Sequence, residues 1–274
     1  MGEARVKEAS ARDAAFAKSK MCIFCGGGVE AATVDHCPPR SIFSHRKWPE
    51  GYVFPACNAC NSGSKLAENW VAFLSRMHSA AGVVDDEQAE VEMRKLAKPL
   101  LKPEVIKAMQ LSAAKKRALA RHLGVGPSPG ETFADMSLVA IPEEAAAAIP
   151  VFARKIAKAL HFEHTGQIVP SDAAIEHRWF TNYNLIEGKV PAEVFSVPTG
   201  IANLRRATVD LSNQFNYRYA IADGGELSIF TMMFRFSFCL TVLLTLDPTL
   251  MARALAEATE RASARADGST PSGE

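Results

Sequence analysis

Residues 21–61 read MCIFCGGGVEAATVDHCPPRSIFSHRKWPEGYVFPACNACN. They contain two Cys-x-x-Cys pairs, Cys22/Cys25 and Cys57/Cys60, whereas chance placement of the chain's six cysteines gives about 0.1 such pairs. Four thiolates in two chelating pairs suit a tetrahedral structural zinc ion. Metal ligation would also supply folding energy to a segment that is too small and too rich in loops to hold together alone. The alternative is two redox or packing pairs that never meet.

The composition of the whole chain excludes some classes of protein. Of 274 residues, 48% are hydrophobic and 22% are charged, which is typical of a globular protein and excludes a wholly disordered one. A net charge of +1 excludes a globally basic nucleic-acid binder, but not a locally basic one. The polar N-terminus has no apolar signal-peptide core, so we expect a cytoplasmic protein.

The residue composition changes along the chain, and the Gly- and Pro-rich segment 124–130 is the expected boundary between two domains. The expected fold class is α+β. Its predicted parts are a tail or frayed helix (1–20), a zinc-bound module (21–80), a basic helical connector (81–125), an α+β domain (130–258) and a disordered tail (259–274).

The second half should mix one helix with several strands. An Ala-rich helix over 143–164 should end at Gly166, and Asp223-Gly224-Gly225 is typical of a hairpin turn. The strands are expected at 132–141, 179–186, 207–210, 215–222 and 227–246. Residues 229–246 approach the length of a membrane span, but they include Arg235, so we expect buried strands and no membrane partner.

Three polar residues lie between and beside the cysteine pairs. Asp35 and His36 fall between the pairs, and Asn61 directly follows Cys60. Asp35 and Asn61 offer oxygen atoms, which suit a hard cation such as Mg²⁺ or Mn²⁺. A neutral His36 could accept a proton from a water molecule that attacks phosphorus. Hydrolysis of a phosphodiester needs such a base and a cation.

The order Cys-x-x-Cys, Asp-His-x-Pro, Cys-x-x-Cys-Asn resembles the HNH, or ββα-metal (His-Me finger), endonucleases. The closest variant is the zinc-stapled one, similar to the phage resolvase endonuclease VII, and the resemblance covers roughly residues 21–75. It implies a ββα module in which His36 is the general base and Asp35 and Asn61 bind the catalytic Mg²⁺ or Mn²⁺. It further implies that the structural zinc is held by Cys22, Cys25, Cys57 and Cys60.

The function expected from this resemblance is a metal-dependent endonuclease that hydrolyses nucleic acid, DNA in preference to RNA. The alternative is a non-catalytic zinc-stapled module that binds nucleic acid. The C-terminal domain could pair with a second copy or with a partner protein. Residues 93–122 carry nine Lys and Arg against one acidic residue. This stretch is either a track for phosphates or a solvated face.

Overall fold

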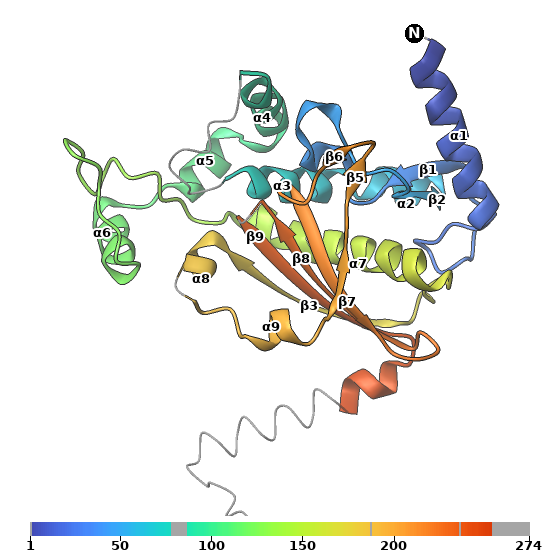
Figure 1. The fold of residues 1–274 in the computed structure, drawn as a ribbon. Helices are drawn as coiled ribbons and strands as arrows, with labels where there is room; N and C mark the ends of the chain where they lie inside the picture. Colours follow the sequence, from blue (N-terminus) through green and yellow to red (C-terminus); the bar gives the residue numbers. More distant parts are fainter. Residues whose placement is uncertain (1, 78–86, 187, 236, 254–274) are drawn as a thin grey trace, which may run out of the picture.

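The computed structural model describes residues 2–77, 87–186, 188–235 and 237–253, and it has the mixed helix and sheet content of an α+β protein (Figure 1). The expected disordered tail over 259–274 lies outside these residues. The α-helices are α1 (Gly2–Lys18), α2 (Asn58–Gly63), α3 (Lys65–Arg76), α4 (Glu87–Leu100), α5 (Pro103–Met109), α6 (Ala113–His122), α7 (Glu143–Thr165), α8 (Asn182–Ile186) and α9 (Glu193–Ser196). Two short 3-10 helices are η1 (Arg40–Ile42) and η2 (Ser44–Arg46). The strands are β1 (Thr33–His36), β2 (Val53–Ala56), β3 (Ala174–Thr181), β4 (Gly200–Ala202), β5 (Arg205–Arg206), β6 (Val209–Asp210), β7 (Phe215–Ile221), β8 (Leu227–Phe234) and β9 (Phe238–Thr245).

The N-terminal module is a hairpin followed by helices. Strands β1 and β2 pair antiparallel, with Thr33 opposite Ala56 and His36 opposite Val53. Helix α2 begins directly after β2, where the Cys57 sulfur accepts a hydrogen bond from the Cys60 amide as an N-cap. Asn61 lies inside α2, and α3 continues the chain along the module. The elements therefore follow the order strand, strand, helix.

The C-terminal half is built on one antiparallel sheet with the strand order β3-β9-β8-β7-β4. The apolar run over 227–246 forms two of its central strands, β8 and β9, which pair with each other along their length. The expected hairpin joins β7 to β8, and Gly224 and Gly225 have φ values of 87° and 81° there, in the region that favours glycine.

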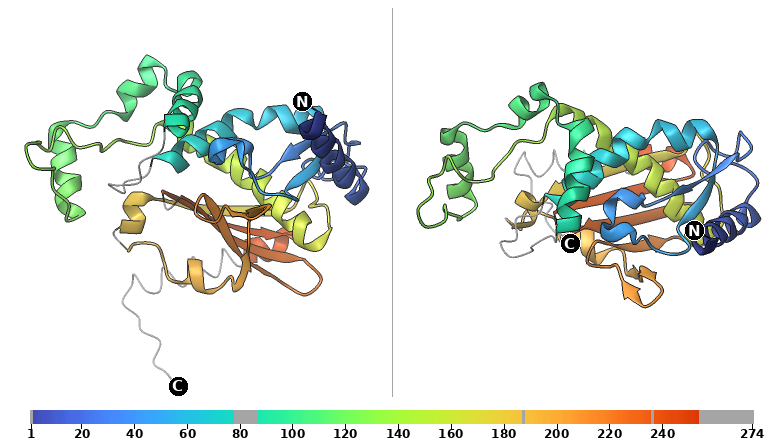
Figure 2. Two further views of the ribbon diagram at one scale, coloured as in Figure 1. Left: turned by 45° about the horizontal axis from the view of Figure 1, so that its top comes forward. Right: turned by 90° about the horizontal axis from the view of Figure 1, so that it is seen from above.

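Helix α7 lies between the module and the sheet (Figures 1 and 2). It ends at Gly166, which has a φ of 70°, as the sequence predicts. Toward the module, Phe162 of α7 packs edge-on against Phe54 of β2, with ring centres 6.4 Å apart. Toward the sheet, Phe152 packs against Phe234 of β8 at 5.8 Å. The buried residues of the module, α7 and the sheet therefore form one continuous hydrophobic core.

Three strand predictions are wrong. Over 207–210, Ala207 and Thr208 form a turn that joins β5 to β6, and Ala207 has a φ of 51° there. The other two predictions fail because short polar side chains bind the local backbone. Over 132–141 a turn forms, in which Asp135 accepts hydrogen bonds from the amide and hydroxyl of Thr132; one bridge, from Val139 to Gln110, is the strand pairing found there. The strand expected over 179–186 stops at Thr181. The Asn184 side chain accepts from the Thr181 amide there, and 182–186 form α8 instead.

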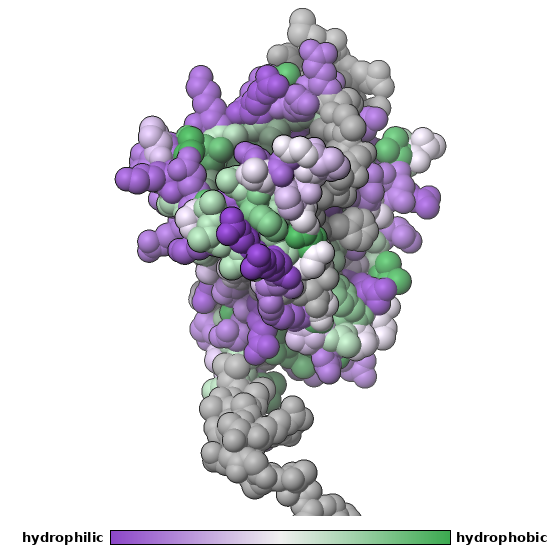
Figure 3. Space-filling model, turned by 90° about the vertical axis from the view of Figure 1, so that its left-hand side faces the viewer, coloured by the Kyte–Doolittle hydropathy of each residue, from purple (hydrophilic) through white to green (hydrophobic). Residues whose placement is uncertain are grey.

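Helices α4 to α6 lead away to the side of the molecule opposite α1 (Figure 1). Figure 3 looks onto this side, where hydrophilic residues surround smaller hydrophobic areas. One lysine of α6 is bound within the protein: the Lys116 ammonium donates to the carbonyls of Ala134 (2.7 Å) and Met136 (2.6 Å). Among the described residues, none of the helices is both long enough and apolar enough to cross a bilayer.

Candidate functional site

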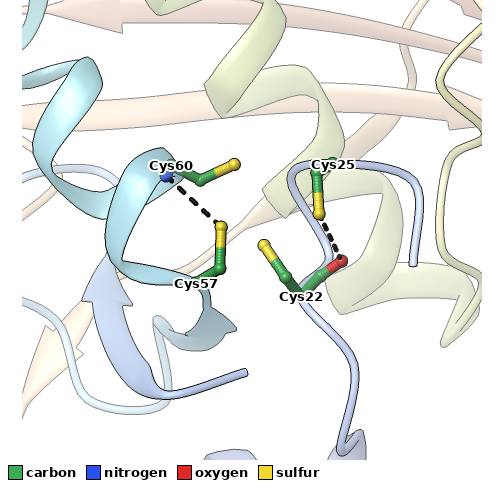
Figure 4. Close-up of side chains that lie close together, drawn as sticks. All are labelled: Cys22, Cys25, Cys57 and Cys60. Carbon is green, nitrogen blue, oxygen red and sulfur yellow. Dashed lines mark hydrogen bonds between the residues drawn. The ribbon is translucent and has the colours of Figure 1, made fainter. Parts of the chain in front are cut away.

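The two cysteine pairs meet, as the sequence predicts. Their four sulfur atoms lie within 4.8 Å of one another, and they converge between the start of α2 and the loop that follows α1 (Figure 4). A tetrahedral zinc ion with Zn–S bonds of about 2.3 Å places its sulfurs about 3.8 Å apart. Small side-chain adjustments would bring the four atoms to this spacing. The cluster can therefore hold a metal ion such as zinc.

Burial and backbone hydrogen bonds shift the pKa values of three of the four thiols. Burial raises the pKa of the Cys22 and Cys60 thiols, whereas the backbone amide of Cys60 lowers the pKa of Cys57. Without a cation, thiols with raised pKa values keep their protons. A bound metal ion replaces those protons, because a coordinating thiol is deprotonated. Binding should therefore depend on pH and should stabilise the fold.

The three polar residues of the motif line one cleft of about 690 Å³. Asp35 and His36 reach it from β1 and Asn61 reaches it from α2, the helix that also carries Cys60 and is capped by Cys57. Three cationic residues complete the wall: Arg12 from α1, Arg40 from η1 and Lys65 from α3. The cleft thus combines a histidine, oxygen donors and positive charge.

His36 is held by two neighbours. Its Nε2 lies 2.8 Å from an Nη atom of Arg40, and its ring packs edge-on against Trp48 with centres 5.7 Å apart. Because a guanidinium has no acceptor atom, Nε2 must be the acceptor in this contact. The contact therefore places Nε2 in an acceptor role, which is the role that a general base requires.

Asn61 is oriented by its amide nitrogen. Nδ2 donates to the hydroxyl of Thr33 (3.3 Å) and to the carbonyl of Val34 (3.2 Å). Since both donor bonds go to β1, the amide is fixed with its nitrogen toward the strand. Oδ1 is then the Asn61 atom that is available as a ligand in the cleft.

Asp35 takes part in a buried charge network. Its carboxylate accepts from the ammonium of Lys155, which reaches it from α7. The same ammonium binds the Glu68 carboxylate and the Ser64 hydroxyl, the latter at 2.7 Å. Ser64 in turn donates to Glu68, also at 2.7 Å. One cation is therefore shared by two carboxylates at the floor of the cleft.

In this network, burial and neighbouring charges shift the pKa values of the ionisable groups in opposite directions. Burial raises the pKa of the Asp35 carboxyl, and the Lys155 ammonium opposes that rise. Burial alone would lower the pKa of Lys155, but the nearby Cys37, Asp35 and Glu68 raise it overall. Burial also raises the pKa of the Cys37 thiol, so this cysteine behaves as a packing residue. Lys155 therefore stays charged and binds Asp35 as a cation.

Sequence reasoning missed five charged residues of this site: Arg12, Arg40, Lys65, Glu68 and Lys155. Arg12 falls in the segment expected to be a tail, and it reaches the cleft because α1 packs against the hairpin. The sequence does contain a pattern that points to Lys155, because this lysine lies on the apolar face of the predicted helix, between Phe152 and Ile156. A lone lysine at such a position needs an acidic partner.

Comparisons of the chain with protein-family models, with curated proteins and with solved structures found no match.

Proposed function

We propose that this protein is a metal-dependent endonuclease of the HNH type that hydrolyses phosphodiester bonds of nucleic acid, DNA in preference to RNA. One observation carries the proposal. Asp35, His36 and Asn61, which the sequence motif singles out, line the same cleft, on a hairpin and helix beside a four-cysteine cluster.

The proposed roles follow from the contacts of each side chain. His36 takes the proton of the attacking water through Nε2. Arg40 contacts this nitrogen when no substrate is bound. A phosphate attracts the guanidinium more strongly than a neutral ring does, so substrate binding draws Arg40 onto the phosphate and leaves Nε2 to the water. Lys65 and Arg12 add positive charge to the same wall of the cleft.

A divalent ion fits the oxygen donors of the cleft. Asn61 Oδ1 and the Asp35 carboxylate would hold it, and Glu68 lines the same floor. Such an ion would supply charge stabilisation to the phosphate and the leaving oxygen. The protein itself binds the phosphate, orients it against His36 and keeps Nε2 of that ring as an acceptor.

A second candidate is the non-catalytic module that binds nucleic acid. The contact between Lys155 and Asp35 favours it, because an ammonium already neutralises the carboxylate that a divalent ion would use. In that case the cations of the cleft would bind phosphate and no cleavage would follow.

Incubation with supercoiled plasmid and with RNA distinguishes the two candidates. Each substrate is tested with Mg²⁺, with Mn²⁺ and with chelator. We expect cleavage that needs the divalent ion, and a loss of about 10²–10⁴-fold in rate for His36→Ala. Binding by the parent with no cleavage under any of these conditions would favour the second candidate. A His36→Ala variant that cuts as fast as the parent would contradict the proposed role of His36.

A further inference from the structure

Basic side chains continue from the cleft across Trp48 to the β5–β6 hairpin. The guanidinium carbon of Arg40, at the cleft, lies 4.1 Å from the centre of the Trp48 ring, and that of Arg206 lies 4.3 Å from it. Both guanidinium groups therefore contact the Trp48 ring, which links Arg40 at the cleft to Arg206 on the hairpin.

Two hydrogen bonds to backbone atoms of the module hold the β5–β6 hairpin in place. Arg206 donates through Nη1 to the carbonyl of Trp48 at 3.2 Å. The amide of Glu50 donates to the carbonyl of Arg205 at 3.0 Å. These bonds join segments that are far apart in the sequence, so the C-terminal half places two arginines at a defined position relative to His36. The Arg205 side chain is exposed and that of Arg206 is partly exposed.

We propose that these cations form a track for the sugar–phosphate backbone of the nucleic acid whose scissile phosphate lies in the cleft. The basic track is defined as Arg12, Lys65, Arg40, Arg206 and Arg205. The class of ligand rests on the proposed function, whereas the path comes from the contacts around Trp48. Guanidinium groups suit phosphate because their donors match its oxygens in pairs.

The same contacts indicate what the track recognises. Since the guanidinium groups of Arg40 and Arg206 both pack against the Trp48 ring, this ring is not a platform for a base. Phosphate contacts position a nucleic acid without reading its sequence. Asp210 is paired opposite Arg205 in the β5–β6 register and reduces the charge at that end. The track should therefore bind many sequences, most strongly near the cleft.

The basic stretch 93–122, which lies within the connector, offers a competing path for the nucleic acid. Helix α6 lies on the side of the molecule opposite α1 (Figure 1), and α1 is one of the elements that line the cleft. Lys116 is bound to backbone carbonyls, and the Arg117 guanidinium lies 5.8 Å from the ring centre of Phe133. The position and contacts of α6 favour a structural or solvated face for it, and they favour the basic track as the path of the substrate.

Two variants with the same change in charge separate these paths. The track variant is Lys65→Gln/Arg205→Gln/Arg206→Gln, in which the new glutamine at 206 keeps a donor for the Trp48 carbonyl. The connector variant replaces three exposed cations of α5 and α6: Lys107→Gln/Lys115→Gln/Arg121→Gln. Both are made in the His36→Ala chain and studied in chelator, so that cleavage does not interfere. Binding of labelled single-stranded and duplex DNA is measured by fluorescence anisotropy at several salt concentrations.

Each phosphate contact contributes about 0.7 to 0.9 to the slope of log affinity against log salt. We therefore expect the track variant to lower the magnitude of the slope by about 2 and to weaken binding about a hundredfold at 0.1 M salt. The connector variant should keep the slope and affinity of its His36→Ala background.

An unchanged slope in the track variant would overturn the proposal, as would an equal loss in the connector variant. Absence of DNA binding by the His36→Ala chain at every salt concentration would also overturn it. If the parent chain binds DNA but does not cut it, the nuclease function fails while the expected loss in the track variant still supports the track.

Discussion

Lys155→Met tests the buried charge network most directly. The Lys155 side chain is 6% exposed, and those of its partners Asp35 and Glu68 are 9% and 11% exposed. Methionine fills similar space but leaves two carboxylates without their shared cation. Removing one partner from a buried ion pair costs about 3–5 kcal/mol. We expect the lower end, about 3 kcal/mol, because both carboxylates border the cleft and can gain water there.

The stability lost in Lys155→Met should grow as pH rises. Burial already raises the pKa of Asp35 above 3.8, and removal of Lys155 raises it further because the opposing charge is gone. A group with a raised pKa binds more protons in the folded state, so its ionisation lowers the free energy of unfolding as pH increases. Lys155→Met should therefore lie closer to the parent in stability at pH 5.5 than at pH 8.

Urea denaturation followed by circular dichroism at both pH values measures these differences. Lys158→Met is the control on the same helix, because this lysine donates to the carbonyl of Phe24 at 2.9 Å and lies near the thiols of the cysteine cluster, not beside Asp35 and Glu68. We expect it to cost about 1 kcal/mol. Equal losses for the two variants, or a Lys155→Met loss that is independent of pH, would refute the charged network as described.

Three further predictions concern the metal sites and the loop beside them. Cys57→Ser should abolish zinc binding and unfold the module, since the binding energy is also folding energy; elemental analysis giving one zinc per folded variant would contradict this. Under the proposed function, Asn61→Ala should raise the Mn²⁺ concentration needed for half-maximal cleavage. Asn61→Asp should return that concentration to the parent value, and a metal titration measures both. Gly26→Ala should destabilise the protein by about 1–3 kcal/mol. Its φ is +75° and its new Cβ would lie 2.7 Å from the Ser171 amide nitrogen, whereas the control Gly28→Ala, at 3.7 Å from the nearest atom, should leave the melting temperature nearly unchanged.

Local patterns in the sequence predict much of the fold and part of the site. The spacing of Cys22, Cys25, Cys57 and Cys60 predicts the cluster, because a tetrahedral ion imposes that spacing. Likewise, Gly166 marks the end of α7 because its left-handed conformation favours glycine. These features depend on residues that are close in sequence or that could bind one shared ion.

The features that sequence reasoning missed depend on long-range packing. Arg206 meets Trp48, and Lys155 meets Asp35, only when the C-terminal half folds against the module. No local periodicity encodes such pairs. The wrong strand over 132–141 has a different cause, since the side-chain bonds of Thr132 and Asp135 compete with strand pairing.

Helix α7 has a consequence for how the chain could be divided. Because Lys155 and Phe162 pack toward the N-terminal module and Phe152 packs toward the sheet, the module and the sheet should unfold as one cooperative unit. A proteolytic cut in the exposed linker over 124–130 would break the chain without separating that shared interior. The two fragments should then stay associated and copurify, and complementation of separately expressed halves would reconstitute the cleft.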